Sequence, residues 1–196
     1  ISPFAFDDEM KVFPEYSPDG KSIAYVRGAG RQRGLMVRSV DGGESIRIAS
    51  DPTSPSAPHF PIFWSRDGAR VYYRSLKGLS VASAAGGEPT LVLPDITAAA
   101  PLPAGDAILI ARRVGNVTKF FITDPPGAEP RPVSAIPETE LRITHLQFSP
   151  DGAKLCMAAP RVSALMIQPW PSGHLSTVPF PSSPQQPRWM PDSRHI

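Results

Sequence analysis

The chain has 196 residues, a formal net charge of +2 and a charged fraction of 19%, which predict no extended positive field for nucleic acid or an anionic membrane. No apolar run reaches about 18 residues, so no segment of this sequence is expected to span a bilayer. The single cysteine, Cys156, rules out an internal disulfide and leaves the compartment open. Its place in an apolar strand favours a buried side chain over a reactive thiol.

A hairpin pattern recurs along the chain. It first occupies residues 16–26 and returns at 63–73 and 147–157. Each copy has a strand ending near an aromatic residue, a Ser-x-Asp-Gly turn and a second apolar strand. Pro presets φ in such a turn and Gly after Asp tolerates positive φ, so each copy predicts a tight antiparallel hairpin.

The copies are regularly spaced. Asp19 and Asp67 are 48 residues apart, and Asp67 and Asp151 are 84 apart, which is two periods of 42. A weak copy at 102–110 falls near the midpoint, and a further one begins at 188–193, where Asp192 follows Asp151 by 41 residues. Periods of about 40 to 50 residues are typical of propeller blades or solenoid units.

A second turn follows each hairpin, at 41–44, 85–89, 126–130 and 171–174, so each copy is expected to hold four strands. The expected strands are 12–17, 22–27, 34–40 and 44–49; 61–65, 70–75, 78–83 and 89–93; 96–102, 107–113, 117–123 and 131–135; and 143–149, 154–158, 163–168 and 175–179. No window has a helical apolar period, and many of the 25 prolines fall in connections such as 51–58 and 179–184.

The motif Ser17-Pro18-Asp19-Gly20-Lys21 followed by Asp41-Gly42-Gly43-Glu44 resembles the WD40-like repeat of TolB-type β-propellers, whose repeat carries a Pro-Asp dipeptide. The third copy departs from it, and the fifth is truncated. The resemblance implies an all-β propeller of four-stranded antiparallel blades, six or more in a ring. Residues 1–196 are then one propeller domain or a fragment of one, with blades near 12–49, 61–93, 96–135 and 143–179 and a fifth starting at 186–196. Both ends look cut.

Alternation along the strands favours the same fold. Ile23 and Tyr25 project to one side and Ala24 and Val26 to the other, and both sets are apolar, as a strand sandwiched between neighbouring sheets requires. The aromatic residues near the ends of the first strands are expected to pack between blades rather than to stack on a ligand. They are Tyr16, Trp64, Phe148 and Trp189.

No catalytic set is predicted. Residues 78–82 (GLSVA) lack the last glycine of a nucleophile elbow and lie in a strand. The four histidines have no metal-ligand spacing, so neither a metal nor a cofactor is expected. The repeated turn residues are expected to be structural, because Asp accepts hydrogen bonds from nearby backbone N–H groups. They are Asp19, Gly20, Asp67, Gly68, Asp151 and Gly152.

One mild signal points to a binding face. The loops between second and third strands and between blades would share one face, away from the Asp-Gly turns. They hold candidate ligand-binding residues Arg31, Arg33, His59, Lys77, Arg113 and Arg161, together with Arg27, Arg112, Arg142, Glu138 and Glu140. Such a basic rim suits a small anionic ligand or an acidic protein segment. The alternative is that these charged side chains are simply solvated and bind no ligand.

The first functional hypothesis is a non-catalytic module that binds a protein or small ligand as a sensory or scaffolding part of a larger bacterial protein. An alternative is the gating propeller of a prolyl-oligopeptidase-like or amidohydrolase-like hydrolase, with its catalytic domain outside these residues. A third is a metal-dependent propeller lyase. The resemblance alone implies a periplasmic or otherwise extracytoplasmic location.

Overall fold

The computed structural model describes residues 11–28, 33–50, 62–159, 162–180 and 187–196. These residues form strands and turns without a helix, so none of them forms a helix able to span a membrane. The chain divides into two compact units, unit 1 from Ile1 to Pro94 and unit 2 from Asp95 to Ile196. Each unit contains two antiparallel four-stranded sheets.

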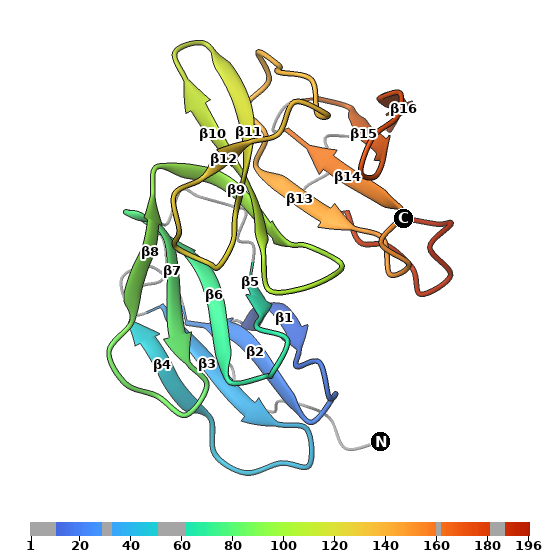
Figure 1. The fold of residues 1–196 in the computed structure, drawn as a ribbon. Helices are drawn as coiled ribbons and strands as arrows, with labels where there is room; N and C mark the ends of the chain where they lie inside the picture. The colour runs from blue at the N-terminus through green and yellow to red at the C-terminus, as the bar shows by residue number, and fades with distance from the viewer. Residues whose placement is uncertain (1–10, 29–32, 51–61, 160–161, 181–186) are drawn as a thin grey trace. The chain divides into compact units, whose positions relative to one another are not determined.

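In unit 1 the strands of each sheet lie side by side in chain order (Figure 1). The first sheet contains β1 (Lys11–Tyr16), β2 (Ser22–Arg27), β3 (Gly34–Ser39) and β4 (Ile46–Ser50). The second contains β5 (Ile62–Trp64), β6 (Arg70–Ser75), β7 (Gly78–Ser83) and β8 (Thr90–Pro94).

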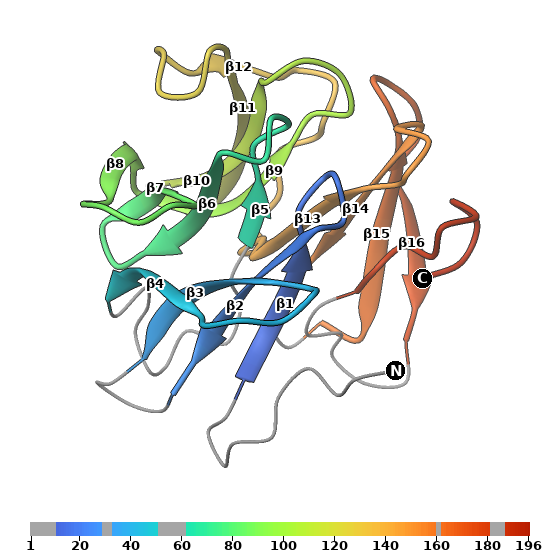
Figure 2. The same cartoon turned by 90° about the horizontal axis from the view of Figure 1, so that it is seen from below.

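Unit 2 repeats this arrangement (Figure 2). Its third sheet contains β9 (Ile96–Pro101), β10 (Ile108–Val114), β11 (Val117–Thr123) and β12 (Arg131–Pro132). The fourth sheet contains β13 (His145–Phe148), β14 (Lys154–Ala158), β15 (Ala164–Pro169) and β16 (Ser176–Pro179).

The predicted fold class, all-β with four-stranded antiparallel sheets, is confirmed. Most strands agree with the expected ranges to within two residues, but the C-terminal part of the expected strand 131–135 is wrong. Strand pairing with β11 covers Arg131–Pro132, followed by one backbone hydrogen bond from Val133 to Phe120. After Val133 the chain leaves the edge of the third sheet. Ile136 is then buried in the apolar cluster of unit 2, and Gln168 donates a hydrogen bond from Nε2 to the Ala135 carbonyl at 2.5 Å. Ala135 and Ile136 therefore make these contacts in unit 2 in place of the strand pairing expected at the end of 131–135.

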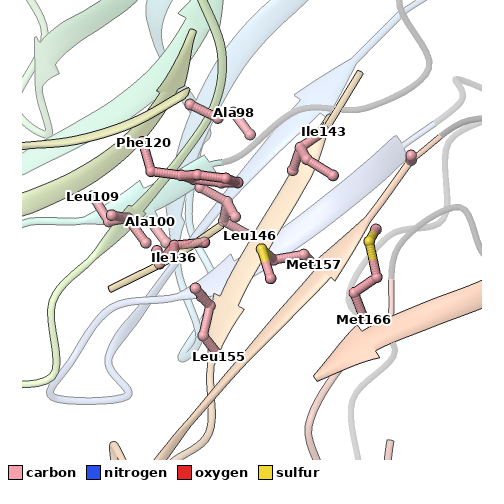
Figure 3. Packing of buried hydrophobic residues seen from close by; sticks show 12 residues of the cluster. Ala98, Ala100, Leu109, Phe120, Ile136, Ile143, Leu146, Leu155, Met157 and Met166 are labelled. Atoms are coloured by element: carbon pink, nitrogen blue, oxygen red, sulfur yellow. The ribbon is translucent and has the colours of Figure 1, made fainter. Parts of the chain in front are cut away.

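Each unit has an apolar core between its two sheets. In unit 1, Ala24 and Val26 of β2 pack in one cluster with Trp64 and Val71 of the second sheet, while Tyr25 faces the other side of its sheet. The alternation predicted for β2 is therefore present. In unit 2 the side chains of the third and fourth sheets interdigitate, and Figure 3 shows them converging. The cluster includes Ala98, Ala100, Leu109, Phe120, Leu146, Leu155, Met157 and Met166 of these sheets, and Ile136 and Ile143 of the connection between β12 and β13.

Two tryptophans link a sheet to the copy that precedes it. The Trp64 indole N–H donates to the Glu15 carbonyl at 2.9 Å, and the Trp189 indole N–H donates to the Gln147 carbonyl at 3.2 Å. Glu15 and Gln147 hold the same place in their copies, one residue before the aromatic end of the first strand. Trp64 and Trp189 thus form a hydrogen bond in addition to the packing expected of them. Tyr16, in contrast, is 64% exposed, so it does not pack as expected.

Antiparallel order gives each sheet two ends. We call the end with the turns between first and second and between third and fourth strands the corner end. The opposite end, with the loops between second and third strands and the connections from one sheet to the next, is the rim end. This assignment follows from the strand order within each sheet.

Candidate functional site

The corner end is built from a repeated Ser-x-Asp-Gly turn. The Ser17, Ser65 and Ser149 hydroxyls donate to the Oδ1 atoms of Asp19, Asp67 and Asp151 at 2.6, 2.5 and 2.6 Å. Each Oδ1 also accepts the backbone N–H two residues later, at 3.0 Å in all three turns. The glycines Gly20, Gly68 and Gly152 have φ of 70°, 70° and 73°, which a side chain would oppose.

These hydrogen bonds stabilise the ionised carboxylates. The serine hydroxyl first and the backbone N–H second lower the pKa of Asp19, Asp67 and Asp151 below 3.8. In the fifth copy the N–H of Arg194, and then the His195 ring, lower the pKa of Asp192 to about 2. Carboxylates held this way close their own turns.

The nucleophile-like motif at 78–82 lies in strand β7. Ser80 is 6% exposed and its hydroxyl donates to Ser75 Oγ at 2.9 Å, so it is held in a hydroxyl pair rather than presented on a strand-to-helix turn. Within the described residues no group of three or more His, Cys, Asp or Glu side chains is placed to hold a metal ion.

The candidate rim residues divide between the units. Arg33 and Lys77 lie at the rim end of unit 1, and Arg113 lies at the rim end of unit 2. The remaining candidates, Arg31, His59 and Arg161, are outside the described residues.

In unit 2 the rim end is an ordered platform around the β10–β11 hairpin. The connection to β13 returns to this hairpin and pairs with it, since Thr118 and Thr139 exchange backbone hydrogen bonds of 2.6 and 3.2 Å. The Thr118 hydroxyl donates to the Leu141 carbonyl at 2.7 Å, and the Leu141 N–H donates to Thr139 Oγ1 at 3.1 Å. We call residues 113–118 and 138–141 the hairpin platform.

Charged side chains brace the same platform. Arg113 Nη1 donates to the Glu140 carbonyl at 2.8 Å, and Lys119 Nζ lies 2.9 Å from Glu138 Oε1. Between them the tip remains open to solvent, with Val114 47% exposed and Asn116 exposed. The rim end of unit 2 thus has a braced hairpin whose tip exposes an aliphatic side chain and an amide.

Sequence reasoning included Arg113, Glu138 and Glu140 in the rim but missed the pairing that organises them. Residues 137–141 (PETEL) lack the alternation of apolar and polar residues that is typical of a strand. The only sequence signal for their pairing with the β10–β11 hairpin is the presence of a threonine on each side, Thr118 and Thr139. It also missed Arg47 of β4, whose side chain crosses to Gly34 at the rim end. A Cβ at Gly34 would lie 3.1 Å from Arg47 Nε.

Repeated four-stranded antiparallel sheets, with a core between the two sheets of each unit, are the architecture of a β-propeller, the fold of TolB and WD40-like domains, and we call the sheets blades from here on. No protein-family model and no curated protein matches the sequence.

Solved structures do match. A structure of a nidogen/laminin complex matches at TM-score 0.70 and 12% identity over 91% of this chain and 68% of that one. TolB from Acinetobacter baumannii matches at TM-score 0.66 and 17% identity over 87% of this chain, and the Niastella koreensis GH74 enzyme at 0.63 and 11% over 83%. This chain spans 44% of the TolB chain and 29% of the GH74 chain. At these identities the likeness concerns the fold, which occurs in enzymes and in non-enzymes.

Proposed function

We propose that this propeller is a non-catalytic module that binds a protein or small ligand through its rim end. The observation that carries the proposal is the hairpin platform of unit 2. Its segments are held together by backbone pairing, threonine hydroxyls and Arg113 before any partner arrives. A surface that is already ordered binds with a smaller entropy loss than one that must be ordered on binding.

The corner end supports the same choice by contrast. Its carboxylates accept hydrogen bonds within their own turns, and their lowered pKa values keep them ionised in that role. A partner that bound these carboxylates would compete with the hydrogen bonds that hold the turn together. The rim end instead exposes the Val114 and Asn116 side chains beside bonded charges.

For the whole protein we propose a sensory or scaffolding part of a larger bacterial protein in an extracytoplasmic compartment. The likeness of fold to TolB, of which this chain spans 44%, supports a larger whole. The gating propeller of a hydrolase is the competing proposal, and the GH74 match is compatible with it. The full-length gene separates the two, because a downstream α/β-hydrolase stretch with Ser, Asp and His in order indicates the enzyme.

Site-specific photocrosslinking tests the binding face. A photoreactive residue is placed at Asn116, on the rim end of the third blade, and in a matched variant at Ala104, on the corner end of the same blade. Both positions are exposed and both sit in turns. The variants are expressed as the full-length protein in its own host.

We expect a discrete adduct from Asn116 and none from Ala104, with the partner identified by mass spectrometry. Adducts from Ala104 alone, or equal adducts from both, would overturn the choice of face. Turnover of hydrolase or lyase substrates by the isolated propeller would overturn the non-catalytic assignment.

A further inference from the structure

Carboxylates are segregated along the strands of unit 1, whereas cations occur at both ends. Its rim end carries five cations, namely Lys11, Arg27, Arg33, Arg74 and Lys77. Most carboxylates among the described residues of unit 1 lie in corner-end turns: Asp19, Asp41, Glu44, Asp67 and Glu88. The one remaining carboxylate among these described residues is Glu15 of β1, and Asp95 begins unit 2.

Three arginines of the first blade are neighbours of Gly34 in the strand register, in the chain or in space. Arg27 is its partner across β2 and β3, Arg33 precedes it in the chain, and Arg47 crosses over it from β4. Gly34 is buried, and the absence of a Cβ gives the Arg47 guanidinium room against the backbone. The Arg47 side chain thus adds a sixth cation at the rim end, although the Arg47 Cα lies nearer the corner end of β4.

One further feature indicates that this cluster is built to receive negative charge. The Nε atom of Arg33 is buried without a hydrogen-bond acceptor among the described residues. A buried guanidinium N–H without an acceptor is uncommon in folded proteins, and an external carboxylate would supply one.

The neighbouring hairpin of the second blade adds an apolar contact. Leu76 and Lys77 form the tip of the β6–β7 turn, and Leu76 is 72% exposed. The two blades share the core of unit 1 and the Trp64 hydrogen bond, which fix the second blade against the first. The rim end of unit 1 therefore combines guanidinium groups with an exposed leucine.

We propose that the rim end of unit 1 binds an acidic peptide segment that carries aliphatic residues between its carboxylates. This proposal rests on the proposed function and names the chemistry of the partner. Guanidinium groups bind carboxylates in bidentate pairs, and Leu76 would be covered by an aliphatic side chain of the same segment. Nucleic acid fits less well, because its affinity comes from an extended array of phosphate contacts and the chain has a net charge of only +2.

Fluorescence polarisation with a labelled peptide of alternating Glu and Leu tests the proposal. The comparison probes are the same peptide with Gln in place of Glu, an oligothymidylate and inorganic phosphate as a competitor. We expect saturable binding of the acidic peptide that weakens as salt is raised, and little binding of the Gln peptide. Tighter binding of oligothymidylate would overturn the assignment to a peptide, and displacement by low phosphate concentrations would reduce the site to an anion site.

Matched variants locate the site. The double variant Arg47→Gln/Lys77→Gln removes two rim-end charges, and its control Arg70→Gln/Lys21→Gln removes two corner-end charges from the same two blades. We expect about tenfold weaker binding for the first and unchanged binding for the second. Equal weakening in both would show a non-specific charge effect and overturn the site. Thermal melting of each variant checks that the fold is retained.

A single variant sharpens the result. Leu76→Ser is expected to weaken binding about tenfold, since an aliphatic contact is lost. No effect of Leu76→Ser contradicts the proposal. If the acidic peptide fails to bind while crosslinks from Asn116 persist, this inference falls and the proposed function stands.

Discussion

At the scale of single residues, polar side chains in this protein differ in how well their hydrogen-bonding capacity is met. The corner aspartates accept two hydrogen bonds on one oxygen, from a serine and from the backbone. Gln168 is fully buried, and its Oε1 has no hydrogen-bond partner in the described structure, while its Nε2 is bonded to Ala135. These two cases lead to opposite expectations on substitution.

The corner aspartates should make stability depend on pH. Their folded pKa values are lowered, mainly by the serine hydroxyls, so the stabilisation is present above the unfolded value of 3.8 and is lost as pH falls through and below it. We expect the urea midpoint to drop steeply in that range. A Ser17→Ala/Ser65→Ala/Ser149→Ala variant should begin lower and show a shallower drop. Equal slopes for the two proteins would contradict this explanation.

Gln168 should tolerate an apolar replacement better than a charged one. Gln168→Met removes an unpaired buried acceptor and keeps the volume, but it also removes the hydrogen bond to the Ala135 carbonyl. Because these two effects oppose each other, we expect a change within about 1 kcal/mol. Gln168→Glu places a carboxylate against the Ala135 carbonyl, and we expect a loss of about 3 kcal/mol at neutral pH that shrinks as the carboxyl is protonated. Chemical denaturation at two pH values measures both. A stability of Gln168→Glu independent of pH would refute the burial argument.

At the scale of elements, the outermost strands of unit 2 carry proline at a position facing away from the blade. The N–H groups of Val133 and Phe180 donate inward, to Phe120 and Ser163. Since the direction alternates along a strand, Pro132 and Pro179 fall at outward positions and offer no N–H there. Exposed edges that lack donors are poor templates for another strand.

Restoring that donor should promote self-association. Pro179→Val gives β16 a further outward N–H and raises its strand propensity, so we expect larger particles in light scattering at high protein concentration. The control Thr177→Val, two residues earlier on the same exposed strand, adds apolar surface without adding a donor. If both variants associate equally, apolar surface rather than the backbone edge is responsible.

The sequence predicts strands well where their formation is local and poorly where it depends on another blade. The Ser-x-Asp-Gly turns carry their own hydrogen-bonding groups, so the hairpins at 16–26, 63–73 and 147–157 could be located from residues alone. The shortened β12 could not, because it depends on where Ile136 and Ala135 find partners in the fourth blade. The role of Arg47 was hidden for a similar reason, since its proximity to Gly34 exists only once β3 and β4 are paired.

At the scale of the whole molecule, each unit has its own core, and burial should govern chemical reactivity. Cys156 is fully buried in the fourth blade among Ala158 and Leu165, and burial raises the pKa of its thiol to about 12. We expect no reaction with an aromatic disulfide reagent until denaturant unfolds unit 2. An Asn116→Cys variant in a Cys156→Ala background should react at once. Rapid labelling of native Cys156 would contradict its buried position.

The indole hydrogen bonds of Trp64 and Trp189 both run backward, from a later copy to the one before it. In both cases a carbonyl near the end of a first strand acquires its donor only when the next forty or so residues exist. During synthesis, the copies that contain Trp64 and Trp189 therefore each supply a hydrogen-bond donor to a copy made earlier. Gene fusions or deletions in such a protein should be tolerated best when they keep that pairing intact.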